Sequence, residues 1–226
     1  MISLLMPTRA RPHNLERISR SILDTAEDIK NIELIIYIDN DDHSYDEYLK
    51  KPLIKPKVIR GERIVLSEMW NKCFEKAKGD ILMHLGDDII FQTKNWDLTV
   101  KETFDDYPDH IVFVYGNDGS PGGRDFGTHG IIHRKWAETV GYFVPPYFSS
   151  DYNDTWLNHV AEMIGRKRYI DILTEHMHPD LHKGDFDITH QERKARHNRD
   201  DVGSIYGSKW QERESDANKL REVMNG

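Results

Sequence analysis

The chain has 226 residues, of which 38% are hydrophobic and 31% are charged. That length suits one α/β domain, and the aliphatic residues fall in short runs from which a core can form. With 31 basic and 39 acidic residues the formal net charge is -8, which excludes binding of nucleic acid through bulk charge.

The apolar runs, the N-terminal residues and the cysteine content together predict the cellular location of the protein. No apolar run approaches the roughly 18 residues that a membrane span needs. The first ten residues, MISLLMPTRA, have no basic region before their apolar stretch, so no signal peptide is predicted. The single cysteine, Cys73, rules out an intrachain disulfide. We therefore expect a reducing, cytoplasmic location.

Strand and helix patterns alternate along the first part of the chain. Residues 2–6 and 32–38 are continuous apolar runs that predict buried strands, and residues 14–26 carry apolar side chains at helical spacing. This order predicts a βαβ unit with a right-handed crossover. Because the runs are continuous and not alternating, the strands are expected in a parallel sheet that is covered on both faces.

The rest of the chain continues the alternation. Residues 50–63 are predicted to be mostly loop, and Ser67 is predicted to cap a helix that ends at Gly79. A strand at residues 80–85 is expected to continue beyond Gly86 as residues 89–91. Short extended pieces are predicted at 58–59 and 64–66, further strands at 111–115, 130–133 and 168–174, and further helices at 97–104, 134–140 and 150–164.

Acidic residues gather directly after two of the predicted strands. Asp39, Asp41 and Asp42 follow one strand, and Asp87 and Asp88 follow another. Ligands of open α/β sheets bind at the carboxyl ends of strands, so the clusters are expected in one cleft, although turns also favour aspartate for local reasons. Adjacent buried carboxylates repel each other unless a cation neutralises them. Oxygen ligands suit Mg²⁺ or Mn²⁺, which also bind substrate phosphates.

Three stretches together resemble the nucleotide-diphospho-sugar glycosyltransferases of the GT-A fold, most of all family 2. ISLLMPTRAR at residues 2–11 resembles the first strand and nucleotide-contacting loop, and IYIDNDD at 36–42 resembles the second strand with its nucleoside-binding aspartate. NKCFEKAKGDILMHLGDDI at 71–89 resembles the helix, Gly-Asp strand and DxD-type metal motif. The resemblance implies one α/β, Rossmann-like domain over residues 1–226, with a mostly parallel central sheet flanked by helices and a charged, helical tail at 190–226.

The resemblance also implies donor and metal residues. Asp88 matches the metal-binding aspartate and Asp87 the residue beside ribose and metal, whereas Gly86 stands where a strict Asp-x-Asp motif begins. His176 is the better match for a histidine that completes the metal site, with His178 as the alternative, and a histidine suits Mn²⁺ better than Mg²⁺. The other donor-binding residues implied are Pro7, Thr8, Arg9, Arg11, Asp39, Asp41 and Lys183, the last of which is expected to reach the leaving diphosphate.

A later stretch resembles the acceptor side of the same family. HGIIHRKWAETVGYF at residues 129–143 resembles its acceptor-side strand and short helix. SSDYNDTWL at 149–157 stands where the family has the acidic motif of its catalytic base, with Ser150 in place of the usual glutamate. Asp151 is therefore expected to be the base and Asp154 the second candidate. The alternative is that either aspartate only caps the following helix.

The resemblance implies metal-dependent transfer of a sugar from a nucleotide-diphospho-sugar to a hydroxyl of a glycan or another acceptor. The expected donor is UDP-linked, and the reaction is expected to invert the anomeric configuration. One alternative is a nucleotidyltransferase with a similar core, which residues 7–11 disfavour because they lack the Gly-rich phosphate loop of that class. Another is a non-catalytic module that binds a nucleotide or a glycan.

The last quarter of the chain holds the one basic cluster and many of the twelve histidines. Arg193, Lys194, Arg196 and Arg199 predict either a solvated helix face or contacts to an anionic acceptor, such as a phosphate-bearing glycan or nucleic acid. For most of the histidines, solvent exposure is the simpler interpretation. Those of this region are His176, His178, His182, His190 and His197.

Overall fold

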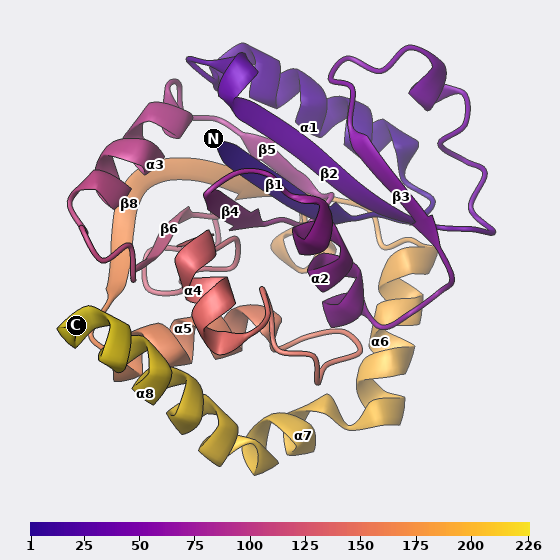
Figure 1. The fold of residues 1–226 in the computed structure, drawn as a ribbon. Coiled ribbons are helices and arrows are strands. Elements are labelled where there is room, and N and C mark those ends of the chain that lie inside the picture. The colour runs from indigo at the N-terminus through magenta and orange to yellow at the C-terminus, as the bar shows by residue number, and fades with distance from the viewer.

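The computed structural model describes residues 1–226 and contains one mixed sheet of eight strands (Figure 1). The strands are β1 (Ile2–Pro7), β2 (Ile32–Asp39), β3 (Lys57–Gly61), β4 (Ile81–His84), β5 (Ile89–Phe91), β6 (Phe113–Asn117), β7 (Ile131–His133) and β8 (Lys167–His176). Their order across the sheet is β3-β2-β1-β4-β7-β6-β8-β5. The first four of these are mutually parallel, which confirms the predicted βαβ start.

Parallel pairing does not extend through the whole sheet. β7 runs antiparallel to both β4 and β6, and β5 runs antiparallel to β8. Four of the seven strand pairs are therefore parallel. The expected α/β architecture is confirmed, with a sheet that is more mixed at one side than the continuous apolar runs indicated.

Eight helices accompany the sheet. They are α1 (Pro12–Thr25), α2 (Leu66–Lys76), α3 (Trp96–Asp105), α4 (Arg134–Val140), α5 (Asn153–Met163), α6 (Ile188–Asp200), α7 (Val202–Ser208) and α8 (Trp210–Asn225). α1 begins at a proline, whose fixed φ suits the first helical position. Its apolar stripe of Leu15, Ile18 and Ile22 is fully buried.

Two apolar cores lie on opposite faces of the sheet. Leu4 of β1 belongs to the core that includes α1 and α3, whereas its neighbour Leu5 belongs to the core that includes α2, α4, α5 and α8. Successive side chains of a strand point to opposite faces. Burial on both faces explains why the strand sequences are continuous apolar runs.

The C-terminal helices follow one another along the lower rim of the molecule in Figure 1, from beside α2 to beside α5. α8 packs on α4 and α5. The buried carboxylate of Asp216 on α8 accepts a hydrogen bond of 3.1 Å from Nε1 of Trp156 on α5. Residues 190–226 are thus helical as expected, and they pack against the body of the fold.

Three local predictions were wrong. Residues 89–91 do not prolong β4 but form β5 at the far edge of the sheet, because the chain leaves β4 after His84 and crosses to pair with β8. Ser67 lies inside α2, where its hydroxyl donates to the carbonyl of Phe148 at 2.6 Å, and Val65 is the N-cap. α2 ends at Lys76 and not at Gly79.

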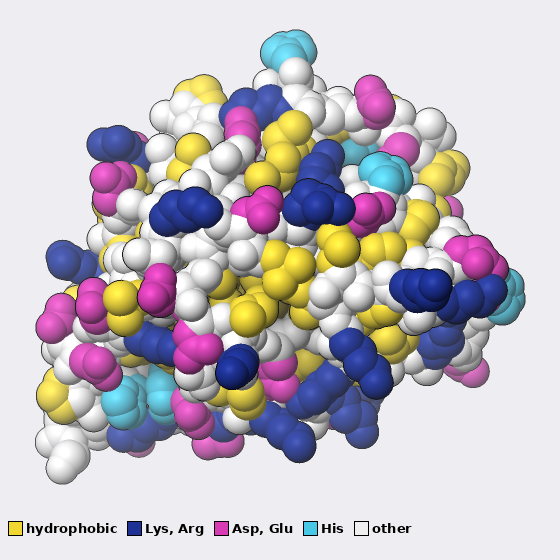
Figure 2. Space-filling view, turned by 90° about the horizontal axis from the view of Figure 1, so that it is seen from above, with side chains coloured by type: hydrophobic (Ala, Val, Ile, Leu, Met, Phe, Trp, Pro, Cys, Tyr) yellow, Lys and Arg dark blue, Asp and Glu magenta, His cyan; other side chains and the backbone are white.

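Acidic and basic side chains are interspersed over the face seen in Figure 2. The net negative charge is therefore not gathered there into one acidic surface, and no continuous basic surface of the kind that tracks a nucleic-acid backbone covers that face. None of the helices combines the length and the apolar composition that crossing a membrane requires.

Candidate functional site

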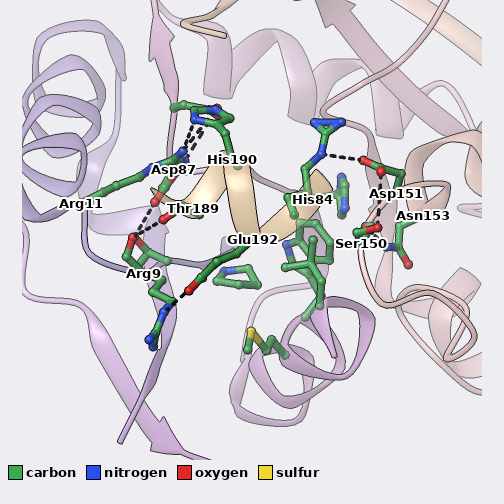
Figure 3. A pocket seen from close by; sticks show the side chains of 18 of the residues that line it. Arg9, Arg11, His84, Asp87, Ser150, Asp151, Asn153, Thr189, His190 and Glu192 are labelled. Carbon is green, nitrogen blue, oxygen red and sulfur yellow. Dashed lines mark hydrogen bonds and ion pairs between the residues drawn. The ribbon is translucent and has the colours of Figure 1, made fainter. Parts of the chain in front are cut away.

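A pocket of about 280 Å³ lies at the carboxyl ends of β1, β2 and β4, beneath α6. It brings together most of the predicted site residues, from segments far apart in the sequence. Those that line it are Pro7, Thr8, Arg9, Arg11, Asp39, Asp87, Asp88, Asp151, Asp154, His176 and His178. Figure 3 shows Arg9, Arg11 and Asp87 on one side of this pocket and Ser150, Asp151 and Asn153 on the other. We call these the first wall and the second wall.

The buried carboxylates of Asp87 and Asp88 are neutralised by a cation of the chain itself. Nη1 of Arg11 donates to Oδ1 of Asp87 at 2.8 Å and lies 4.0 Å from Oδ2 of Asp88. Thr8 donates to the other oxygen of Asp87 at 2.7 Å. Burial still raises the pKa of Asp87, against the attraction of Arg11. The expected cation at this strand end is therefore, in part, the guanidinium of Arg11.

Asp88 forms a second ion pair on its other oxygen. Its Oδ1 lies 3.3 Å from Nε2 of His176. Burial alone would raise the pKa of Asp88, but the hydrogen bond and charge of His176 outweigh burial and lower it. Conversely, burial would lower the pKa of His176 and Asp88 raises it. An aspartate oxygen and an imidazole nitrogen thus face each other at the end of β4 and β8.

The Asp88–His176 pair fits a divalent cation by the chemistry of its donors. One carboxylate oxygen and one imidazole nitrogen suit Mn²⁺ better than Mg²⁺, and such ions commonly use few protein ligands together with water and substrate phosphates. No three His, Cys, Asp or Glu side chains are arranged to hold a metal ion in this structure. His178 lines the same pocket, with its ring centroid 5.1 Å from that of His176.

The N-terminus of helix α6 covers the first wall. This contact was not predicted from the sequence. Both oxygens of Asp187 accept hydrogen bonds from Arg11, at 2.6 and 2.7 Å. Asp187 also caps α6 through a capping box with His190, whose ring nitrogen accepts from Arg11 at 2.8 Å. His190 is consequently buried and not solvent-exposed. Burial alone would raise the pKa of Asp187, but the hydrogen bond from Arg11 outweighs burial and lowers it.

Replacing Arg11 with alanine is expected to lower the free energy of unfolding by about 3 kcal/mol, because it leaves buried carboxylates without their partner. Arg11 is only 5% exposed. The measurement is urea denaturation followed by circular dichroism. Arg20→Ala is the control, since its ion pair with Glu16 is exposed and is worth about 0.5 kcal/mol or less. Equal stability losses in the two variants would contradict this assignment.

Asp39 ends β2 as a buried carboxylate with one free oxygen. Its Oδ2 accepts from Nη1 of Arg9 at 2.7 Å and lies 3.9 Å from Nε of Arg63. Its Oδ1 is buried and has no hydrogen-bond partner. Burial raises the pKa of Asp39 in spite of Arg9. A buried acceptor without a partner costs free energy and suits an incoming N–H donor.

On the second wall, neither predicted aspartate caps the helix that follows. The N-cap of α5 is Tyr152, at φ 73°, and no side chain caps the helix. Asp151 has both oxygens engaged by α6: Oδ2 lies 2.5 Å from Nδ1 of His197, and Oδ1 lies 3.2 Å from Nε of Arg193. Neither aspartate is therefore the N-cap of α5.

Asp154 has a freer carboxylate than Asp151. Only Oδ1 accepts hydrogen bonds, from the backbone and hydroxyl of the adjacent Thr155. Burial raises the pKa of Asp154 to about 6, and the nearby charge of Asp151 adds to this. A half-buried carboxylate with a raised pKa and a free oxygen in a pocket has the properties of a general base.

Two predicted donor residues lie outside the pocket lining. Asp41 is 66% exposed and pairs with Arg9, and Lys183 pairs with Glu175 at 2.8 Å. In the basic cluster, Arg193 and Arg196 line the pocket, whereas Lys194 does not and Arg199 pairs with Asp200. The role of this cluster toward an acceptor stays a prediction.

Several pocket residues were not predicted from the sequence. They are Arg63, His84, His129, Thr189, His190, Glu192 and the nearby Asp187. The pattern Asp187-Ile188-Thr189-His190 is a helix-start signal that could have identified the beginning of α6. Nothing in the local sequence of His84 or His129 indicates that either histidine faces the pocket.

Comparisons with known proteins agree with this geometry. The model of the family "Glycosyl transferase family 2" matches residues 3–179. Among curated proteins, none matches the sequence significantly. A mannosyltransferase from Pyrobaculum calidifontis, solved with GDP-Man and Mn²⁺, has a TM-score of 0.58 at 12% identity. TarS 1-349 of S. aureus, solved with UDP-GlcNAc, has a TM-score of 0.57 at 12% identity.

A third similar structure is GalNAc-T7 with UDP, GalNAc and Mn²⁺, at a TM-score of 0.64 and 13% identity. The three alignments cover 77%, 76% and 78% of this chain. They cover only 56%, 57% and 43% of the other chains. This chain therefore spans little more than half the length of the first two structures, and the likeness shows the fold.

Proposed function

The chain belongs to glycosyl transferase family 2, and on that premise we propose that it transfers a sugar from a nucleotide-diphospho-sugar to an acceptor hydroxyl. The observation that carries the proposal is the meeting of two carboxylates in one pocket. Asp39 offers a free buried oxygen, and Asp88 is paired with His176. The first suits a nucleoside, and the second suits a cation that binds a diphosphate.

Asp88 and His176 would hold the divalent cation, with Mn²⁺ favoured over Mg²⁺ by the imidazole. When bound, that cation would supply positive charge to the leaving diphosphate. The structures with GDP-Man and Mn²⁺ and with UDP, GalNAc and Mn²⁺ support this choice. Arg11 contributes a fixed positive charge beside the same carboxylates.

The surroundings of Asp39 support a uridine diphosphate donor. Oδ1 of Asp39 can accept one N–H, while Arg9 and Arg63 place guanidinium groups next to it on Oδ2. An acceptor with guanidinium donors nearby can bind the imide of uracil, which has an N–H between two carbonyl groups. Guanine would present two adjacent N–H donors, and Arg9 already occupies the second carboxylate oxygen.

On the second wall we place the general base at Asp154, because both oxygens of Asp151 are engaged by Arg193 and His197. The acceptor oxygen attacks the anomeric carbon as the bond from that carbon to the diphosphate oxygen breaks. The acceptor proton passes to Asp154, and the nucleoside diphosphate leaves with the bonding electrons. A single displacement of this kind inverts the anomeric configuration.

Donor selectivity gives a direct test of the nucleoside assignment. By calorimetry, UDP is expected to bind more tightly than GDP, ADP or CDP. Asp39→Ala is expected to weaken UDP binding about 10- to 100-fold, because a hydrogen bond to a buried charged group is lost. The loss should be the same with and without Mn²⁺. Asp41→Ala is the control, as Asp41 is exposed; tighter binding of GDP than UDP would refute the uracil assignment.

The reaction itself is tested with a panel of nucleotide sugars, Mn²⁺ and sugar or glycan acceptors. Release of nucleoside diphosphate together with a glycosylated acceptor supports the proposed transfer. Release of pyrophosphate would instead indicate nucleotidyl transfer. Donor binding without turnover on any acceptor of a broad panel would indicate a non-catalytic module.

A further inference from the structure

His129 is a buried histidine without a hydrogen-bond partner in the pocket. It is only 6% exposed, and neither of its ring nitrogens has a partner. Leaving a buried polar group unpaired costs free energy, so such a group calls for a specific explanation. Because neither ring nitrogen is engaged within the chain, a nitrogen lone pair of His129 is available to a ligand in the pocket.

The backbone around His129 is held in place while its ring is not. The carbonyl of Gly130 accepts a hydrogen bond of 2.8 Å from the backbone of His84, and Thr128 donates to Asp118 at 2.7 Å. Gly130 itself allows a close approach, since a Cβ there would lie 2.0 Å from the ring of Phe113. His129 is therefore presented by a fixed segment at the start of β7.

The ring of His129 borders the same space as the Asp88–His176 pair. The ring centroids of His129 and His176 are 5.0 Å apart, with the planes at 79°. A Cβ on Gly86 would lie 2.8 Å from Oδ1 of Asp88 and 3.6 Å from Cε1 of His129. A side chain at position 86, where a strict Asp-x-Asp motif has its first aspartate, would thus enter the space between Asp88 and His129.

We infer that His129 is a third protein ligand of the divalent cation and supplies, from the turn just before β7, the donor that Gly86 cannot supply. The inference rests on the metal site of the proposed function and deepens it. The three side chains do not yet meet at metal-binding distance in this structure, so binding requires the His129 ring to turn. The turn breaks no hydrogen bond, because the ring makes none. Two imidazoles and one carboxylate favour Mn²⁺ or Co²⁺ over Mg²⁺.

The test measures metal binding without any nucleotide, by electron paramagnetic resonance of free Mn²⁺ and by the visible absorption of Co²⁺. His129→Asn is expected to weaken Mn²⁺ binding at least about 10-fold. His84→Asn is the matched control, because His84 is a buried pocket histidine with one unpartnered nitrogen whose ring packs against Trp70, with the planes tilted by 41°. It should bind Mn²⁺ as the wild type does. Circular dichroism and thermal unfolding establish that both variants fold.

Two further variants test the ligand role apart from the fold. His129→Asp keeps three ligands and should retain binding, with the preference moved toward Mg²⁺. Adding Gly86→Asp to His129→Asn returns a carboxylate to the motif and should restore Mn²⁺ binding. The inference is overturned when folded His129→Asn binds Mn²⁺ like the wild type, or when His84→Asn alone loses binding.

The outcomes also separate this inference from the proposed function. If the wild type binds no Mn²⁺ and transfers sugar without any metal, the metal-ligand role of His129 is overturned and the proposed glycosyl transfer is not. If His129→Asn loses Mn²⁺ binding while the wild type transfers no sugar from any donor, the role of His129 as a metal ligand is supported and the proposed glycosyl transfer is overturned.

Discussion

Replacing Asp88 with asparagine is expected to lower sugar transfer by about 10²–10³-fold while leaving the fold intact. Asp88 supplies the carboxylate that pairs with His176 at 3.3 Å, and asparagine keeps its shape but not its charge. The leaving diphosphate then loses charge stabilisation that is worth several kcal/mol. The measurement is the initial rate of nucleoside diphosphate release at saturating Mn²⁺, together with the Mn²⁺ affinity.

Asp80→Asn is the control for that variant. Asp80 lies just before the same strand, β4, and is 66% exposed, with only the N-terminal amine 3.8 Å away. Its rate and its Mn²⁺ affinity should match those of the wild type. An Asp88→Asn protein with unchanged Mn²⁺ dependence would move the metal site elsewhere in the pocket. The Asp39 side of the site would be unaffected by that result.

The site residues that could be predicted from the sequence are those that directly follow one strand. Asp39 and Asp88 each follow a continuous apolar run, and parallel strands β1, β2 and β4 bring their carboxyl ends to one edge. The end of each apolar run marks the end of its strand, so the position of each carboxylate is set by its own segment. Asp39 of the first acidic cluster and both aspartates of the second therefore line one pocket, whereas Asp41 and Asp42 do not.

The closure of the pocket by α6 depends on pairings that no local pattern encodes. Arg11 and Asp187 are 176 residues apart in sequence, and a charged helix such as α6 carries many cations and carboxylates that could pair elsewhere. The same holds for β5, whose three residues gave no sign that they would join β8 and not prolong β4. Side-chain pairing across the fold and strand order are properties of the whole chain.

The α6 contacts also explain why the two aspartates of the second wall differ. In sequence Asp151 and Asp154 are equivalent carboxylates three positions apart. In the structure both oxygens of Asp151 contact side chains of α6, those of Arg193 and His197, whereas Asp154 keeps a free oxygen. Because both oxygens of Asp151 already contact α6, Asp154 has the oxygen that is free to accept a proton from the acceptor hydroxyl.

Asp154→Asn is expected to reduce turnover by about 10²–10⁴-fold, the usual worth of a general base, with donor affinity unchanged. The base must be deprotonated, and burial places the pKa of Asp154 at about 6. The kcat/KM of the wild type should therefore rise about tenfold per pH unit below 6 and level off above it. Asp154→Asn should lose this rise, because asparagine does not titrate.

Asp151→Asn is the comparison that decides between the two carboxylates. If Asp151 only pairs with Arg193 and His197, its asparagine variant keeps the rise of kcat/KM near pH 6 and loses much less turnover. Collapse in Asp151→Asn, with near-normal turnover in Asp154→Asn, would transfer the role of base to Asp151 and require α6 to release it during turnover. Normal turnover in both variants, with a product that retains the anomeric configuration of the donor, would contradict single displacement, because a retaining reaction does not need a carboxylate on the acceptor side to remove the proton.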